Sequence, residues 1–583
     1  MEMSSHLAER RASLERRHGP WRERTLGAML RAVADEQPDR VFVVDEEVGG
    51  ASWTYSAIAD RATRLARGLV ESGVAPGDRV AMVLPNGADF VAVRFAIALA
   101  GGVAMPIGHR LKGTELRQVL GVGHPAAVVT MESFRDVDAL SNLDQALPGW
   151  DDPGGPQHGG GREVRLVVVV PTAGSEPARP GVRALVDLEL DDRPELDREL
   201  VSRSARVGPA DVATIFFTSG TTGRPKGVVS THDMELRSAY GSAYSRGFED
   251  GRRILFALPS SHVFAYIEGI LASMFVAGSV VVQAAFDPEA TLEAIERHSV
   301  GEVLLVPTMS LAVVSAAARR PRNLSSLHSV MSAAQSAPAR LWTDLYETLG
   351  VESCITAYGM SETSAATTFT EPGCPIEDLV ETVGRPKPGG VAGDPALGGC
   401  LAEYRTVDPD TLEELPPGVE GELVVRGPIV TPGYFADPAA TAEAMLEGGW
   451  LRSGDLGRVR ADGALVLTGR SKELYKCGGE LVSPVEVESC LCRRPEVDQA
   501  YVVGVPDARM GEVGAAWVVP SESARQAIDP VALVEHCRAE LARFKVPAYV
   551  LVVPAEDLPL TPSGKVQRFV LAERAAKELG LSG

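Results

Sequence analysis

One stretch of the sequence joins hydroxyls, glycines and a single lysine to an apolar run. The run at residues 214–217 is short and rich in β-branched and aromatic residues, which predicts a buried strand. The glycines of the loop that follows allow backbone N–H groups to point into one concavity, which suits phosphate oxygens. Hydroxyl donors and one cation complete this candidate site, which comprises Thr218, Ser219, Gly220, Thr221, Thr222, Gly223 and Lys226. The alternative at this point is an ordinary glycine-rich surface loop.

Two further motifs place a carboxylate beside glycine. Tyr358-Gly359-Met360-Ser361-Glu362 follows a predicted strand at residues 354–357. Its ring can stack on a base, and its hydroxyl and carboxylate suit phosphate and Mg²⁺. Asp455 lies in a short turn after Gly454, where a carboxylate can accept hydrogen bonds from both ribose hydroxyls. Taken alone, either motif could be a plain polar turn.

Basic residues and one histidine add to these candidates. Lys565 follows Pro562-Ser563-Gly564, so it is presented on a loop as a mobile cation that could offset negative charge in a reaction. His262 stands in a Pro-x-x-His segment, and no Asp or Glu lies between Leu258 and Glu268 to pair with a substrate ammonium. The alternatives are an ordinary basic loop and a structural histidine.

The elements that must hold these residues alternate along the chain. Strands are predicted at residues 80–84, 104–107, 254–258, 280–282 and 303–306, and helices at 55–73, 89–99, 289–298, 309–318 and from Tyr266. This alternation predicts two α/β units, each with a mainly parallel sheet and helices on both faces. Residues 400–470 are β-rich with many glycines, and a small α+β unit begins at about 471. We further expect a charged helical arm at residues 1–25, a mobile loop at 151–162 and an inserted loop at 389–399.

The composition narrows the class of protein. A chain of 583 residues is too long to fold around a single hydrophobic core, so at least two domains are expected. A net charge of −21 argues against nucleic acid and against an anionic membrane surface as partners. No run approaches the roughly 18 apolar residues that span a bilayer, and the N-terminus lacks a signal-peptide core. Seven cysteines without metal spacing, including Cys490 and Cys492, predict reduced thiols and a cytoplasmic protein.

Five motifs in order resemble those of the adenylate-forming superfamily, which holds acyl-CoA synthetases, firefly luciferase and peptide-synthetase adenylation domains. They are the phosphate loop, the Tyr-Gly-x-Ser-Glu motif, Ser-Gly-Asp, the hinge around residues 469–480 and Pro-x-x-Gly-Lys near the C-terminus. The resemblance covers residues 30–575 and is greatest to acyl-CoA synthetases. It implies an α/β fold with a large N-terminal domain at residues 1–469 and a small mobile α+β lid at 470–583. The large domain would hold both α/β units and the β-rich subdomain.

The resemblance also implies roles for individual residues. Lys226, Glu362 and Lys565 would be catalytic, with Glu362 binding Mg²⁺. ATP would be held by the phosphate loop together with Tyr358, Ser361, Asp455 and Arg470. The acyl pocket would include His262, Val263, Phe264, Ala333 and Ala334, although the family usually has glycines where Ala333 and Ala334 stand, so their methyls would crowd the adenine or the acyl group. Lys472 would be the hinge pivot, and Lys476, Gly478 and Gly479 would reach the site during the thiol step.

The implied activity is ATP-dependent conversion of a carboxylic acid to an acyl-adenylate with release of pyrophosphate, followed by transfer to CoA. ATP, Mg²⁺ and CoA would be the cofactors, and a small aryl or alkyl carboxylic acid the substrate. Two alternatives stay open: loading of an acyl carrier protein in trans, and a non-catalytic nucleotide- or acyl-binding module. The presence of Lys226, Glu362, Asp455 and Lys565 counts against the second. A P-loop nucleotide hydrolase is disfavoured because Pro225 precedes the lysine of the loop.

Overall fold

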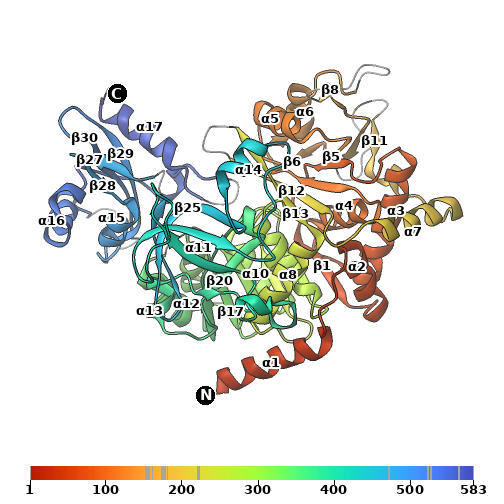
Figure 1. The fold of residues 1–583 in the computed structure, drawn as a ribbon, viewed down its shortest axis with the longest axis horizontal. Helices are drawn as coiled ribbons and strands as arrows, with labels where there is room; N and C mark the ends of the chain where they lie inside the picture. Colours follow the sequence, from red (N-terminus) through yellow and green to blue (C-terminus); the bar gives the residue numbers. More distant parts are fainter. Residues whose placement is uncertain are drawn as a thin grey trace.

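The computed structural model describes residues 2–151, 158–159, 162–172, 179, 182–219, 224–335, 337–470, 473–521, 524, 528–561 and 565–581. Two seven-stranded sheets with covering helices form the larger part of this structure, and smaller sheets follow towards the C-terminus. The C-terminal elements gather to one side of the larger part (Figure 1). None of the helices among the described residues has the length and apolarity needed to cross a bilayer.

The first large sheet carries the predicted phosphate strand. Its order is β11-β10-β5-β3-β4-β12-β13, and every neighbouring pair is parallel except β12 with β13. Val80 and Met82 of β3 enter one core and Ala81 enters another, so helices cover both faces, as predicted. The strands and helices of this unit are β3 (Arg79–Met82), β4 (Val103–Pro106), β5 (Ala127–Met131), β6 (Ser133–Phe134), β7 (Val137–Asp138), β10 (Leu166–Val170), β11 (Arg183–Ala184), β12 (Val212–Ser219), β13 (Pro225–Thr231), α3 (Tyr55–Glu71), α4 (Ala88–Leu99), α5 (Gly113–Gly123), α6 (Ala139–Ala146) and α7 (Pro194–Arg206).

The second large sheet has the order β18-β17-β16-β14-β15-β1-β2. Two of its strands come from the N-terminus, which the division into successive units did not predict, because the partner of a parallel strand can be far away in sequence. Val43 of β1 pairs in parallel with Val280 of β15. The elements of this unit are β1 (Val41–Asp45), β2 (Ala51–Thr54), β14 (Arg253–Phe256), β15 (Ser279–Val282), β16 (Glu302–Leu305), β17 (Ser329–Ser332), β18 (Ser353–Ile355), α2 (Leu26–Glu36), α8 (His232–Ser245), the π-helix Phe264–Leu271, α9 (Ala272–Met274), α10 (Pro288–His298), α11 (Pro307–Arg319) and α12 (Ala339–Leu349).

Antiparallel strand pairs dominate the rest of the described chain, where a β-rich region and a small α+β unit were predicted. A three-stranded sheet and a five-stranded sheet consist of β19 (Ala357–Met360), β20 (Ala365–Phe369), β21 (Arg385–Pro386), β22 (Glu403–Val407), β23 (Gly421–Arg426), β24 (Met445–Leu446), β25 (Trp450–Val459) and β26 (Leu465–Arg470), with α13 (Ile376–Glu381) and α14 (Pro438–Ala444) beside them. The C-terminal unit has its own core and comprises β27 (Tyr475–Cys477), β28 (Glu480–Val482), β29 (Val497–Asp507), β30 (Gly511–Pro520), β31 (Tyr549–Val552), α15 (Pro484–Leu491), α16 (Pro530–Glu540) and α17 (Arg568–Glu578).

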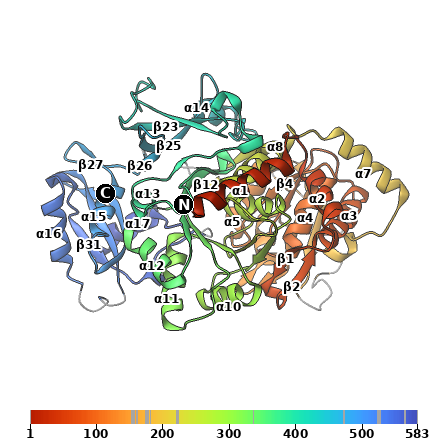
Figure 2. The same cartoon turned by 90° about the horizontal axis from the view of Figure 1, so that it is seen from below.

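The N-terminal arm is a helix, as expected: α1 (Glu2–His18) lies beside α8 (Figure 2). Arg11 Nη2 donates to the carbonyl oxygen of Ser245 at 2.8 Å, and Leu14 is buried. The segment at 389–399 forms two short 3₁₀ turns, closed where Gly389 N donates to Gly399 O at 2.8 Å. Of the predicted loop at 151–162, residues 152–157 and 160–161 lie outside the described residues, and β8 (His158–Gly159) pairs with β9 (Arg162–Glu163).

Candidate active site

The predicted phosphate loop is the turn of a β-hairpin. β12 and β13 are antiparallel, with Thr218 opposite Lys226 and Ser219 opposite Pro225. Gly227 must be glycine for a packing reason, since a Cβ there would stand 2.8 Å from Ile215 Cγ2 and 3.3 Å from Phe435 Cβ. The described strands therefore hold Thr218 and Lys226 side by side at the end of the hairpin where the connecting loop begins. Four predicted phosphate ligands, Gly220, Thr221, Thr222 and Gly223, and the side chain of Ser219 lie outside the described residues.

Residues 431–435 join this hairpin to Glu362, a connection that the motifs did not predict. Tyr434 Oη donates to Glu362 Oε1 at 3.0 Å, and Lys226 Nζ lies 4.8 Å from the centre of the Tyr434 ring. The only sequence signal for this segment is a Pro432-Gly433 turn followed by two aromatic residues. Two predicted catalytic residues, 136 positions apart in number (362 − 226), thus share one neighbour.

Glu362 is presented by a tight 3₁₀ turn, Ser361–Thr363, directly after β19. Ser361 and Thr363 are buried and Glu362 is half-buried, so the carboxylate is the exposed part of the turn. Among the described residues, Tyr434 is the side chain that bonds one carboxylate oxygen, and the other oxygen has no partner. A carboxylate with one oxygen available suits Mg²⁺, which binds proteins through one or two carboxylates and keeps several waters or phosphate oxygens. The residues present therefore fit a magnesium site.

Asp455 lies at the centre of a polar group in which it and Tyr358 are buried and Arg470 is exposed. Its side chain accepts a hydrogen bond from Tyr358 Oη at 2.5 Å and pairs with Arg470 Nε at 2.8 Å, while the residue is 4% exposed. The pairing follows from strand register, because Asp455 of β25 stands opposite Arg470 of β26. Burial and the Asp455 charge raise the pKa of Tyr358, so its hydroxyl stays protonated and donates. The structure thus brings together three residues predicted to hold the nucleoside.

Lys565, which belongs to the C-terminal unit, interacts electrostatically with Asp455 and Arg470 of this group. Its loop is closed by Thr561, whose N–H donates to Lys565 O at 2.7 Å and whose Oγ1 accepts from Lys565 N at 3.0 Å. Burial, with the positive charge of Arg470 second, lowers the pKa of Lys565, and Asp455 and Glu362 act in the opposite direction. The ammonium therefore lies within electrostatic reach of both predicted carboxylates.

His262 faces the same cation. Burial, and to a smaller extent Lys565, lower the pKa of His262 to about 3, so its imidazole is neutral near pH 7. Its loop is anchored by Asn86, which donates to Leu258 O at 2.9 Å and accepts from Ser260 N at 2.7 Å. The predicted acyl residue and the predicted adenylation lysine are therefore neighbours in space.

The other predicted acyl-pocket residues lie on two elements. Val263 is buried and Phe264 is half-buried at the start of the π-helix, a distortion that often occurs at functional sites. Ala333, after β17, is buried, whereas Ala334 is exposed and adopts φ +77°. Alanine in this left-handed region carries a strain that glycine would not. This is consistent with the glycine that the related motif carries there.

Glu268 is the carboxylate nearest to this pocket in sequence, and it is already paired. The residue is fully buried; its Oε1 accepts from Ala366 N at 3.2 Å and its Oε2 pairs with Arg246 at 3.3 Å. A carboxylate held in this way is not available to a substrate ammonium. Glu268 therefore adds no free acidic partner to the segment around His262.

The predicted thiol-step loop is the turn between β27 and β28. Gly478 and Gly479 have φ of +61° and +96°, a conformation that glycine adopts without strain. Lys476 is exposed, and its backbone N–H donates to Glu512 Oε2 at 2.8 Å. The backbone conformation is therefore one reason for glycine at both positions. The sequence predicted a different reason, that glycine leaves room for a ligand. Lys472, the predicted pivot, lies outside the described residues.

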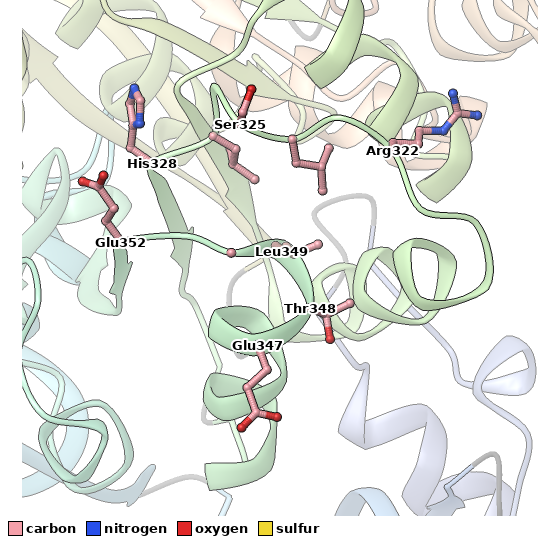
Figure 3. Close-up of a pocket in the computed structure, with 10 residues that line it drawn as sticks. Arg322, Ser325, His328, Glu347, Thr348, Leu349 and Glu352 are labelled. Atoms are coloured by element: carbon pink, nitrogen blue, oxygen red, sulfur yellow. The ribbon is translucent and has the colours of Figure 1, made fainter.

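A separate hollow of about 350 Å³ opens between residues 322–328 and the C-terminal end of α12 (Figure 3). It is lined by residues that precede β17 and β18, so it lies at the amino ends of these strands. Ala333 and Tyr358 instead follow the carboxyl ends of the same two strands, where ligands of α/β sheets bind. None of the predicted site residues lines the hollow.

Comparison with known proteins agrees with this geometry. Residues 30–435 match the family model of the AMP-binding enzymes, and residues 486–565 match that of the AMP-binding enzyme C-terminal domain. The chain is 31% identical to a putative acyl-CoA synthetase, YngI, of Bacillus subtilis, over 96% of this chain and 98% of that protein. It is 35% identical to a feruloyl-CoA synthase of Amycolatopsis, over 89% and 93%. The ATP-bound crystal structure of MatB from Rhodopseudomonas palustris superimposes with a TM-score of 0.74 and 26% identity, covering 94% of this chain and 99% of MatB.

Proposed function

The chain belongs to the AMP-binding enzyme family, and we propose that it is an AMP-forming acid–thiol ligase that makes an acyl-CoA. The observation that carries this proposal is the position of Lys565, a cation of the C-terminal unit that lies near Glu362, Asp455 and His262 of the larger part. A lysine placed there can serve a reaction in which negative charge develops between a carboxylate and a phosphate. Nothing in the chemistry requires a covalent enzyme intermediate.

In the first half-reaction a carboxylate oxygen of the acid attacks the α-phosphorus of ATP. The new bond is a mixed anhydride, and the bond to the pyrophosphate oxygen breaks, so pyrophosphate leaves. Lys565 offsets the charge that gathers on the α-phosphate oxygens, while Lys226 and the hairpin loop hold the β- and γ-phosphates. Tyr358, Ser361, Asp455 and Arg470 hold the nucleoside part. Mg²⁺ at Glu362, when bound, offsets phosphate charge.

In the second half-reaction a thiolate attacks the acyl carbonyl and AMP leaves. We assign the thiol to CoA, because the relatives described above are named as acyl-CoA-forming enzymes. The chain would divide at residues 469/470 into the large domain and the C-terminal lid. This boundary is supported by β26, which ends the five-stranded sheet at Arg470, and by the next sheet, which begins at Tyr475. Lys472 would be the pivot between the two.

The proposal is tested by supplying aryl and alkyl carboxylic acids with ATP, Mg²⁺ and CoA, and by identifying the products. AMP, pyrophosphate and an acyl-CoA are expected in equal amounts. Release of ADP and phosphate would contradict an adenylating enzyme. If the enzyme catalyses pyrophosphate exchange but transfers the acyl group to a carrier protein and not to CoA, the carrier protein is the acceptor. If it binds ATP without catalysing exchange, the protein is a non-catalytic binding module.

Free α-amino acids are expected to be poor substrates. Glu268, the carboxylate nearest to His262 in sequence, is buried against Arg246 and is not free to pair with their ammonium. Burial of an unpaired charge is costly. The measurement is pyrophosphate exchange with matched pairs, such as a simple aryl acid and its α-amino counterpart. Exchange that is strong with the amino acid and absent with the simple acid would contradict this expectation.

Gly479→Leu is expected to slow acyl transfer to CoA by at least tenfold and to change pyrophosphate exchange by less than threefold. A side chain built there meets no atom within 4 Å, so its bulk projects into the space that we assign to the pantetheine arm. Gly463→Leu is the matched control: Gly463 has φ +83°, also has open space, and lies in the turn between β25 and β26. It carries the same backbone strain without touching the proposed path. If acyl transfer slows equally in both variants, backbone strain and not a blocked path causes the effect.

A further inference from the structure

We propose that Tyr434 is a positioning residue that keeps Lys226 and Glu362 apart and aims each of them at its own ligand. This inference rests on the proposed function, because it assigns Lys226 to the ATP phosphates and Glu362 to Mg²⁺. It concerns the segment 431–435, to which neither the motifs nor the comparisons assign a role.

The backbone of the segment is fixed to both elements that it joins. On the hairpin side, Phe435 N donates to Gly227 O at 2.7 Å and Val229 N donates to Gly433 O at 3.2 Å. On the other side, Thr431 N donates to Glu362 O at 2.7 Å. Residues 431–435 therefore tie the return strand of the phosphate hairpin to the turn that presents Glu362.

Two threonines hold the main chain around Tyr434: Thr431 belongs to the same segment, and Thr441 belongs to the following helix, α14. Thr431 Oγ1 donates to Val229 O at 2.6 Å, and Thr441 Oγ1 accepts from Tyr434 N at 2.9 Å. Gly433 has φ +144°, and a Cβ there would stand 2.4 Å from Thr441 Cγ2. The main chain at Tyr434 is thus held on both sides, which leaves its side chain little freedom of direction.

The tyrosine side chain makes two different contacts. Its ring face receives the Lys226 ammonium at 4.8 Å, a cation–π distance, and its hydroxyl donates to Glu362 Oε1 at 3.0 Å. One side chain therefore binds a cation with its face and a carboxylate with its edge.

This arrangement has a consequence for the charges. Lys226 and Glu362 have opposite charge and share a neighbour, yet they form no ion pair with each other in the described structure. A direct pair would neutralise the cation intended for phosphate and the carboxylate intended for Mg²⁺. The Tyr434 ring gives the ammonium a weaker partner than a carboxylate would, and a polyphosphate can displace it. The hydroxyl fixes one oxygen of Glu362 and leaves the other for the metal, as partners of metal-binding carboxylates do.

The test measures nucleotide binding by calorimetry without acid or CoA, with ATP in EDTA and with ATP in Mg²⁺. Tyr434→Phe keeps the ring and removes the hydroxyl. ATP affinity in EDTA is expected to stay within twofold of wild type, whereas the gain in affinity on adding Mg²⁺ should fall by about tenfold, as for loss of a hydrogen-bond partner of a metal ligand. An unchanged gain would overturn the role assigned to the hydroxyl.

Tyr434→Leu also removes the ring, so Lys226 becomes free to pair with Glu362. ATP affinity in EDTA should then fall by about fivefold, because a lysine held in an ion pair of about 1 kcal/mol must be released before it binds phosphate. Adding Glu362→Gln to this variant removes the competing carboxylate and should restore most of that loss. Failure of the double variant to recover affinity would overturn the spacer role. A merely structural role predicts no such recovery.

Tyr244→Phe is the matched control. Tyr244 has the same two kinds of contact, since its hydroxyl donates to Glu15 Oε1 at 2.8 Å and Arg11 lies 5.5 Å from its ring centre. It lies on α8 beside α1, away from the predicted site residues, so nucleotide binding should not change. Thermal unfolding of every variant separates folding defects from binding defects. If the wild-type protein binds no ATP, the proposed function itself is contradicted. If the wild-type protein binds ATP and Tyr434→Phe shows the same gain in affinity on adding Mg²⁺, only this inference is contradicted.

Discussion

Replacing Lys565 by alanine is expected to lower pyrophosphate exchange by two to three powers of ten, an effect of about 3–4 kcal/mol typical of losing one preorganised charge. The reason is the site that the lysine occupies, beside Asp455, Glu362 and His262. Acyl transfer from a supplied acyl-adenylate to CoA should fall much less, because the lysine is assigned only to the first transition state. The measurement compares exchange with single-turnover transfer in the same preparation.

Lys577→Ala provides the control, since Lys577 is an exposed lysine in the last turn of α17 and touches none of the predicted site residues. Both half-reactions should keep wild-type rates in this variant. If Lys565→Ala slowed the two half-reactions equally, the lysine would serve both, and the division of labour between two lid positions would be wrong.

The same lysine should set the alkaline limb of the adenylation rate. Burial and Arg470 lower the pKa of Lys565, so its positive charge is lost as pH rises through a value below that of an exposed lysine, about 10.4. Adenylation should therefore decline before that pH. Lys565→Arg keeps its charge at all these pH values, so its rate, although lower, should show no such decline. A decline that persists in the arginine variant would assign the titration to another group.

Asp455→Asn is expected to lower kcat/KM for ATP by about 100-fold. The carboxylate bonds Tyr358 at 2.5 Å and Arg470 at 2.8 Å while almost fully buried. An amide of nearly the same volume removes the charge that holds both partners and that we assign to the ribose hydroxyls. Hydrogen bonds to a charged group contribute about 1.5–3 kcal/mol each, so a loss of about 3 kcal/mol is a conservative estimate. The measurement is pyrophosphate exchange over a range of ATP concentrations.

Asp462→Asn serves as the comparison for this variant. Asp462 pairs with Arg385 at 2.6 Å in the turn between β25 and β26, where its side chain is 37% exposed. Surface ion pairs contribute little, about 0–1 kcal/mol, so ATP kinetics should be unchanged. An Asp455→Asn enzyme with unaltered KM for ATP and a lowered unfolding temperature would show that Asp455 has a structural role only.

Several parts of the site could be predicted from short stretches of sequence, because the chemistry of each part is local. A strand followed by glycines, hydroxyls and a lysine predicts a phosphate loop whatever surrounds it, and the hairpin of β12 and β13 carries Lys226 where expected. The alternation of strands and helices likewise predicted parallel sheets. The π-helix at Phe264–Leu271 was predicted only as a helix from Tyr266, since apolar spacing does not distinguish the two hydrogen-bond patterns.

The sequence by itself thus determined which side chains are available for chemistry and on what kind of element each stands, because these depend on neighbours a few residues apart. Only the tertiary structure decided which of them meet. It placed β1 beside β15, engaged Glu268 with Arg246, and brought Tyr434 into contact with both Lys226 and Glu362. Such contacts join segments tens to hundreds of residues apart, and they are set by strand register and packing, which leave no periodic trace in the sequence of either segment.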